Sequence, residues 1–206
     1  MSPAFSRIDS KVQRSAFLRG ALSVARRAHA GQLRQTGCEE IPFIEHSLAV
    51  ADLLAEQNYP EEVLAAGLLH DVLESGDAEH RALRGRFGDA VADAVEALTE
   101  DDSIVGYEER KREHRERVAT AGPQARAIFA ADKAANVAVL REAYAVLGES
   151  VDEELPVSLD MKILVWEYDL EMLFVNSPGV PLVDRFADEM VGLWGQRAEG
   201  EHAPLC

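Results

Sequence analysis

Apolar residues recur at helical spacing along almost the whole of this 206-residue chain, and this periodicity limits the folds that are open to it. A strand with one buried face would alternate apolar and polar residues, and no run of useful length does so. The pattern therefore predicts an all-α protein. The clearest stripe, within residues 12–30, consists of Phe17, Leu18, Ala21, Val24, Ala25 and Ala28.

Glycine, proline and short polar runs separate the expected helices. Residues 36–42 predict a loop, and the run "GESVDEELP" at residues 148–156 predicts a mobile connection. Pro60 followed by two glutamates is typical of a helix N-terminus. Helices are therefore predicted at residues 12–30, 43–57, 60–74, 80–87, 88–98, 107–120, 124–147, 159–174 and 182–197.

The chain shows no internal repeat and no change of composition that would mark a domain boundary. Because 47% of its residues are hydrophobic, it can build one sizeable core. We therefore expect a single helical-bundle domain over residues 1–198, followed by a disordered tail at residues 199–206.

The sequence carries none of the usual signs of export or membrane insertion. No apolar run approaches the roughly 20 residues that a membrane-spanning helix needs, and residues 1–15 lack the apolar core of a signal peptide. The two cysteines, Cys38 and Cys206, are too few for a disulfide framework or a cysteine zinc site. We expect a cytoplasmic protein that does not contact a membrane.

The net charge of −16 at pH 7 argues against a nucleic-acid partner, because such a field repels phosphate backbones. A small anionic substrate stays compatible with this charge if a local cation or metal ion offsets the repulsion. The sequence leaves a homo-oligomer open.

Ionisable side chains interrupt three otherwise apolar segments. The run "AAGLLHDVLESGD" at residues 65–77 carries His70 and Asp71 side by side, with Glu74 one helical turn later. His46 lies in "FIEHSLAV", and Asp132 lies in "AADKAANV". A buried helix tolerates such groups only when something compensates them, so either they mark a helix end facing water or a cation lies between them. Nitrogen and oxygen donors without cysteine suit Mn²⁺, Fe²⁺ or Zn²⁺.

Each of these residues alone has an ordinary structural explanation. A single buried histidine such as His46 is more often hydrogen-bonded in a core than bound to a metal. Asp132 could pair with Lys133 or Arg126. Their coincidence in three apolar segments favours the metal site over a metal-free structural protein.

Together with their order and spacing, these segments resemble the HD-domain superfamily of metal-dependent phosphohydrolases. Within it, the chain is most similar to the hydrolase domain of the RelA/SpoT enzymes of the stringent response and to their stand-alone small relatives. The similarity covers about residues 15–140. It is carried by residues 25–37, 41–55, 65–75, 87–103, 109–111 and 130–136.

This resemblance implies an all-helical fold that binds one divalent metal, usually manganese, and removes the 3′-pyrophosphate from guanosine tetra- or pentaphosphate. Glu74 matches the acidic position that orients or deprotonates the attacking water. Arg34 and Asn136 match residues of the substrate pocket, while His29 and Gln32 are expected to be buried and to shape the loop by hydrogen bonding. The implied metal ligands are His46, His70, Asp71 and Asp132.

The chain departs from the family at the substrate side of the site. Ser75 replaces the second acid of a Glu-Asp catalytic pair, and Gln35 replaces a lysine that follows Arg34 in the substrate pocket. Phe129 replaces a lysine, and Ala138 and Val139 replace arginine and threonine. Two alternatives therefore stay open: hydrolysis of another phosphorylated nucleotide such as NADPH, or a non-catalytic sensor that binds metal and nucleotide.

The remaining histidines, the charged run and the tryptophans are expected to have structural roles. His80, His114 and His202 are expected at the surface because their neighbours are polar. The charged run at residues 107–118 is expected to be a solvated helix face with internal ion pairs. Because residues 109–111 match the family, a contribution of its cations to phosphate binding is the alternative. Trp166 and Trp194 fit apolar stripes and are expected in the core or in an interface.

Overall fold

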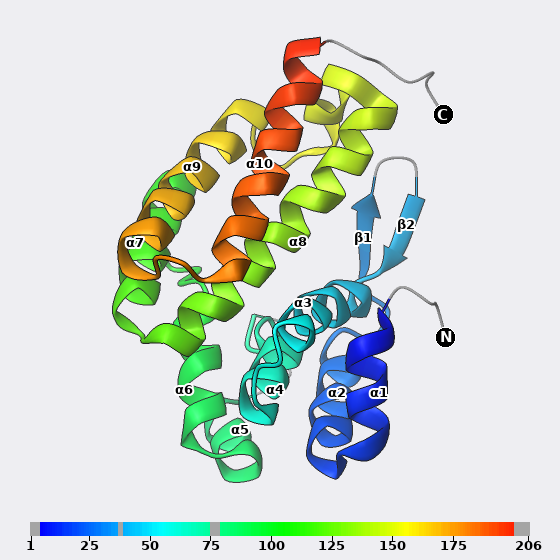
Figure 1. Cartoon of the computed structure of the whole chain (residues 1–206), viewed down its shortest axis with the longest axis vertical. Helices are drawn as coiled ribbons and strands as arrows, with labels where there is room; N and C mark the ends of the chain where they lie inside the picture. Colours follow the sequence, from blue (N-terminus) through cyan, green and yellow to red (C-terminus); the bar gives the residue numbers. More distant parts are fainter. Residues whose placement is uncertain (1–4, 37–38, 75–78, 200–206) are drawn as a thin grey trace.

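The computed structural model describes residues 5–36, 39–74 and 79–199, and within these ranges it is almost entirely helical (Figure 1). The all-α prediction is confirmed. The elements in chain order are α1 (Ser6–Arg14), α2 (Ala16–Ala28), β1 (Leu33–Thr36), β2 (Glu39–Pro42), α3 (Ile44–Glu56), α4 (Glu61–Leu69), α5 (His80–Phe87), α6 (Asp89–Leu98), α7 (Tyr107–Thr120), α8 (Pro123–Leu147), the 3₁₀ helix η2 (Gly148–Glu154), α9 (Leu159–Asn176) and α10 (Pro181–Glu199).

The first predicted helix is in fact two helices. Ser15 adopts an extended conformation (φ −112°, ψ 121°) and caps α2, its hydroxyl accepting a hydrogen bond from the Leu18 N–H at 3.2 Å. The same hydroxyl donates to Glu61 at 2.9 Å, which ties the junction to the start of α4. Serine at the N-cap satisfies an otherwise unpaired amide, so it starts a new helix where the apolar stripe alone predicted continuity.

A short hairpin replaces the predicted loop at residues 36–42. β1 and β2 pair antiparallel, with Arg34 opposite Ile41. Strands of four residues are too short for alternation to be visible in the sequence. The expectation for the entry to the hairpin is met only in part. His29 is buried and its Nδ1 lies 2.9 Å from Gln32 Oε1, but Gln32 is exposed, where a buried side chain was expected.

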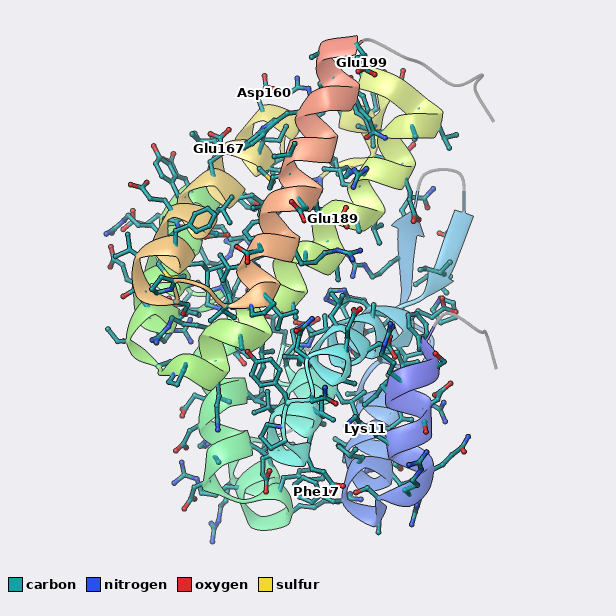
Figure 2. The ribbon with its side chains drawn as sticks, viewed as in Figure 1. Lys11, Phe17, Asp160, Glu167, Glu189 and Glu199 are labelled. Carbon is teal, nitrogen blue, oxygen red and sulfur yellow. The ribbon has the colours of Figure 1, made fainter. Side chains whose placement is uncertain are left out.

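The core of the molecule lies where α3 and α4 pack together and against α8, the longest helix, which α10 follows along its length (Figure 1). Gly67 permits the close approach of α3 and α4, because a Cβ at this position would lie 2.6 Å from Leu54 Cδ1. On α10, Glu189 pairs with Arg141 of α8 and with Arg185 (Figure 2). At the other end of the bundle, Phe17 of α2 meets Phe87 of α5 edge to face at 5.6 Å.

Leu54→Ala is expected to lower the free energy of unfolding by about 2–5 kcal/mol, because the Leu54 side chain is fully buried and the gap would be closed only partly. Urea denaturation monitored by circular dichroism measures this loss. Leu33→Ala, at a side chain that is 55% exposed, is the matched control and should change stability by less than about 0.5 kcal/mol. Equal effects of the two substitutions would show that α3 does not pack as described.

Two further predictions need correction. The "GESVDEELP" run is a 3₁₀ helix with Val151 buried, where a mobile connection was expected. Helix α4 ends at Leu69, five residues earlier than the expected end at Glu74. Trp166 is in the core as expected, while Trp194 is 39% exposed, so its expected place in an interface stays a prediction. Glu199 ends α10, and the rest of the expected tail lies outside the described residues.

Among the described helices, none is both long and apolar enough to cross a membrane.

Candidate metal centre and active site

Three segments bring the four predicted metal ligands together at the centre of the molecule. His46 stands in the first turn of α3, His70 and Asp71 directly follow α4, and Asp132 lies in α8. His46 Nε2 lies 3.0 Å from Asp132 Oδ1 and 3.6 Å from Asp71 Oδ2. His70 Nε2 lies 3.1 Å from Asp71 Oδ2 and 3.7 Å from Asp132 Oδ1. Donor atoms of His46, His70 and Asp132 all lie within 4.8 Å of one another.

The histidine rings are oriented as metal ligands are. His70 Nδ1 lies 2.9 Å from the Gly67 carbonyl oxygen and therefore carries the proton of that hydrogen bond. This leaves Nε2 free to offer a lone pair, and it faces His46 Nε2 at 3.2 Å. Two unprotonated ring nitrogens at this distance repel each other unless a proton or a cation lies between them. The donor set of two imidazoles and two carboxylates fits a borderline divalent cation.

Within the cluster, the neighbouring charges lower the pKa values of the two carboxylates and raise the pKa of His70. Burial alone would raise the pKa of Asp71, but His70 and His46 lower it to about 2. Lys133 and the two histidines lower the pKa of Asp132 well below its usual value despite burial. The carboxylates in turn raise the pKa of His70 well above its usual value, whereas burial outweighs them at His46 and lowers its pKa. Without metal, the cluster therefore holds a proton at His70.

Asp132 links the predicted metal ligands to the predicted substrate pocket. Its Oδ1 accepts a hydrogen bond from Asn136 Nδ2 at 2.7 Å, and its Oδ2 accepts one from Lys133 Nζ at 2.8 Å. Asn136 Oδ1 in turn accepts from Arg34 of the hairpin at 2.8 Å. The structure thus places Arg34 and Asn136 beside the ligands, while Gln35 is exposed on β1 and lines a separate cavity next to Asn136.

Glu74 lies at the edge of the same cluster. Its Oε1 accepts a hydrogen bond from the Glu100 backbone N–H at 3.1 Å. Desolvation by the cavity walls and the charge of Asp71 raise the pKa of Glu74 to about 7. Such a carboxylate can accept a proton near neutral pH. Ser75, the other predicted catalytic residue, lies outside the described residues.

The predicted ligands and Glu74 line a cavity of about 210 Å³. The residues of its opposite wall were not predicted to belong to the site. His114 is only 4% exposed and packs edge to face on Phe129, so its placement at the surface was wrong. Val118, fully buried one helical turn after His114, was the available signal that this face of α7 points inward. Sequence reasoning gave no role in the site to Glu100, His114 or Lys133, and it weighed the run that contains Lys111 only as a possible source of cations for a phosphate.

A larger cavity of about 450 Å³ adjoins the site, because Arg34 and His46 line both spaces. The departures Ala138 and Val139 lie in its wall with Ala134. Small apolar side chains therefore form one part of the wall of this space, and charged residues such as Glu45, Asp52 and Glu142 form another.

A second group of ionisable side chains, His80, Asp93 and Glu96, lies on α5 and α6 at the surface. Arg84 already pairs with Asp93 at 2.5 Å, so a cation there would have to compete with an arginine. This group provides a matched comparison for the buried cluster.

Residues 21–143, more than half of the chain, match the HD domain family. Among curated proteins, the bifunctional (p)ppGpp synthase/hydrolase SpoT of Escherichia coli is 44% identical over 87 residues, which are 42% of this chain and 12% of that protein. The GTP pyrophosphokinase of Streptomyces coelicolor is 30% identical over 202 residues, 92% of this chain and 23% of that protein. The chain thus spans less than a quarter of the length of these relatives.

Two solved structures share the fold. A metazoan SpoT orthologue that hydrolyses ppGpp superposes with a TM-score of 0.70 and 26% identity, over 91% of this chain and 97% of that one. A Listeria monocytogenes protein superposes with a TM-score of 0.67 and 31% identity, over 73% of this chain and 99% of that one.

Proposed function

The chain belongs to the HD domain family, and from this premise we propose that it is a metal-dependent hydrolase that removes the 3′-pyrophosphate of guanosine 3′,5′-bis(diphosphate). The observation that carries the proposal is the convergence of His46, His70, Asp71 and Asp132 beside Glu74 in one cavity. The relatives named as pyrophosphohydrolases and the ppGpp-hydrolysing structural neighbour support this substrate.

In this proposal, His46, His70, Asp71 and Asp132 hold one divalent cation, with Mn²⁺ as the first choice and Fe²⁺ or Zn²⁺ as alternatives. A bound cation polarises a phosphoryl oxygen and lowers the pKa of water. The second oxygen of Asp132 is held by Lys133, so this carboxylate keeps its orientation when its first oxygen is engaged.

Glu74 is the proposed general base. It takes a proton from the water that attacks the phosphorus attached to the ribose O3′. The bond between that phosphorus and O3′ then breaks, pyrophosphate departs, and O3′ ends protonated. One water is consumed, and GDP and pyrophosphate are the products.

Basic side chains around the cavity make it suitable for an anionic nucleotide despite the net charge of −16. Arg34, Lys111 and Lys133 line the cavity, and Lys162 lies in the neighbouring one with Arg34 and Gln35. Burial and the positive charges of the nearby lysines lower the pKa of Lys162 to about 8. This shift shows that several cations lie close together at this side of the cavity. Arg34 and Asn136, with Gln35, are the proposed substrate-binding residues.

NADPH hydrolysis is the second candidate, because Ala138 and Val139 border an apolar cavity of about 450 Å³ beside the ligands. The test is a comparison of kcat/KM for guanosine 3′,5′-bis(diphosphate) and NADPH with the same protein and metal. The proposal expects the guanosine substrate to be preferred. A preference for NADPH that Ala138→Arg or Val139→Thr reverses would replace it with the second candidate.

A non-catalytic sensor is the third candidate, motivated by Ser75 and Gln35. It expects nucleotide binding in calorimetry without any product, and activity that appears only after Ser75→Asp. The proposed hydrolase expects turnover without that substitution.

Metal affinity should rise with pH. Because neighbouring carboxylates raise the pKa of His70, the metal-free protein carries a proton there at pH 7, and the cation must displace it. One released proton tightens binding by up to about tenfold per pH unit below the His70 pKa. Mn²⁺ titrations at pH 6, 7 and 8 measure this slope. An affinity that is independent of pH would contradict binding at His70.

We also propose that residues 1–198 act as one domain and that the protein works in the cytoplasm on a small-molecule nucleotide, without nucleic-acid or membrane partners.

A further inference from the structure

The carboxylate of Glu74 is held by the backbone of another segment. Within residues 5–36, 39–74 and 79–199, its one side-chain hydrogen bond comes from the Glu100 N–H, at 3.1 Å. Glu100 follows α6 and lies in the irregular connection of residues 99–106 that leads to α7. No helical ladder fixes the direction of this N–H, so other contacts must do so.

Two cations of α7 hold the Glu100 side chain. Glu100 Oε2 accepts from Arg110 Nε at 3.0 Å, and Glu100 Oε1 contacts Lys111 Nζ. Arg110 also donates to the Ile104 carbonyl oxygen at 3.0 Å. One arginine therefore ties both ends of the connection to the first turns of α7.

We call Glu100, Arg110 and Lys111 the clamp. Its contacts are shielded enough from solvent to fix the geometry of the Glu100 side chain. The side chains of Glu100, Arg110 and Lys111 are between 16% and 23% exposed. Charge-assisted hydrogen bonds at such exposure are stronger and more directional than fully exposed pairs. The clamp can therefore set the position of the Glu100 backbone as well as its side chain.

We propose that Glu100 is a positioning residue for Glu74: Arg110 and Lys111 clamp its side chain, and the clamped residue presents its N–H to the Glu74 carboxylate. This inference rests on the proposed function only for the role of Glu74 as base. It adds α7 to the active site as the element that orients the base.

The kinetic test uses Glu100→Ala with Glu113→Ala as the matched control. Glu113 also pairs with an arginine of α7, Arg117, at 3.1 Å, but does not line the site cavity. Misplacing a reacting group by about 1 Å can cost up to about 100-fold in rate, so kcat for Glu100→Ala should fall about 10- to 100-fold. KM should stay within about twofold, since no substrate contact is removed. Glu100→Gln keeps one of the two acceptor oxygens and can still accept from one of the two cations, so it should recover part of the loss. Glu113→Ala should retain wild-type kcat.

A rise in KM with unchanged kcat would overturn the inference, because Glu100 would then act through Lys111 on substrate binding. Equal losses in Glu100→Ala and Glu113→Ala would also overturn it, since the effect would be general to α7.

Hydrogen exchange of the Glu100 amide tests the same contact without any substrate. The amide should exchange slowly in the wild type, and at least about tenfold faster in Glu74→Ala and in the double variant Arg110→Ala, Lys111→Ala. Unchanged exchange in Glu74→Ala would disprove the contact, whatever the substrate is. If exchange responds as expected but the wild type leaves guanosine 3′,5′-bis(diphosphate) intact, the proposed function fails and the positioning contact stands.

Discussion

His70→Ala is expected to abolish tight metal binding and to lower guanosine 3′,5′-bis(diphosphate) hydrolysis by about a thousandfold or more, because the metal supplies several kcal/mol of transition-state stabilisation. His70 is 3% exposed, and its Nε2 faces His46, Asp71 and Asp132 within 3.7 Å. Alanine removes one donor and leaves Asp71 without the imidazole that lies 3.1 Å from its Oδ2. Metal content by mass spectrometry and the rate under saturating substrate measure the two effects.

His80→Ala is the control for this substitution. His80 also lies near two carboxylates, Asp93 and Glu96, but in the surface group where Arg84 already pairs with Asp93. It should keep wild-type metal content and activity. If His70→Ala and His80→Ala lost metal equally, the buried cluster would not be the binding site.

Glu74→Gln should lower kcat by about 10²- to 10⁴-fold while leaving metal stoichiometry unchanged. Glutamine keeps an oxygen that can accept the Glu100 N–H, but it cannot accept a proton from water. Because Glu74 is not among the donor atoms that converge between the histidines, the cation should still bind. Single-turnover kinetics with Mn²⁺ measure the loss.

The pH profile gives this prediction a second readout. Since the pKa of Glu74 is raised to about 7, the fraction of ionised base falls as pH drops, and wild-type kcat should fall on the acid side. A bound divalent cation lowers that pKa, so the midpoint is expected at or below pH 7. Glu74→Gln should lose this acid limb. A variant that kept both the limb and most of kcat would exclude Glu74 as the base.

The helices could be predicted because their signals are local, and the cluster of His46, His70, Asp71 and Asp132 could be expected from polar residues in apolar segments together with the family resemblance. Apolar periodicity marks a helix over many residues, and His70-Asp71 in an apolar run is costly enough to need an explanation. The hairpin at β1 and β2 could not be predicted, because four-residue strands leave too few residues to show alternation. The helix break at Ser15 was not predicted, because the apolar stripe of the expected helix continues on both sides of this N-cap residue.

The wall of the cavity that comes from α7 was not predictable for a different reason. Lys111 and His114 lie in a run so rich in charge that a solvated face is the ordinary interpretation. Their burial depends on Glu100, Phe129 and Lys133, which are distant in sequence and approach only in the folded bundle. Tertiary packing, which no local pattern encodes, decides which charges of this helix face inward.

The most direct test is product analysis after the purified protein is incubated with Mn²⁺ and guanosine 3′,5′-bis(diphosphate), with His70→Ala in parallel. GDP and pyrophosphate are expected in equal amounts from the wild type, and almost none of either from His70→Ala. Intact substrate with a metal-loaded wild type, or equal product from both proteins, would contradict it.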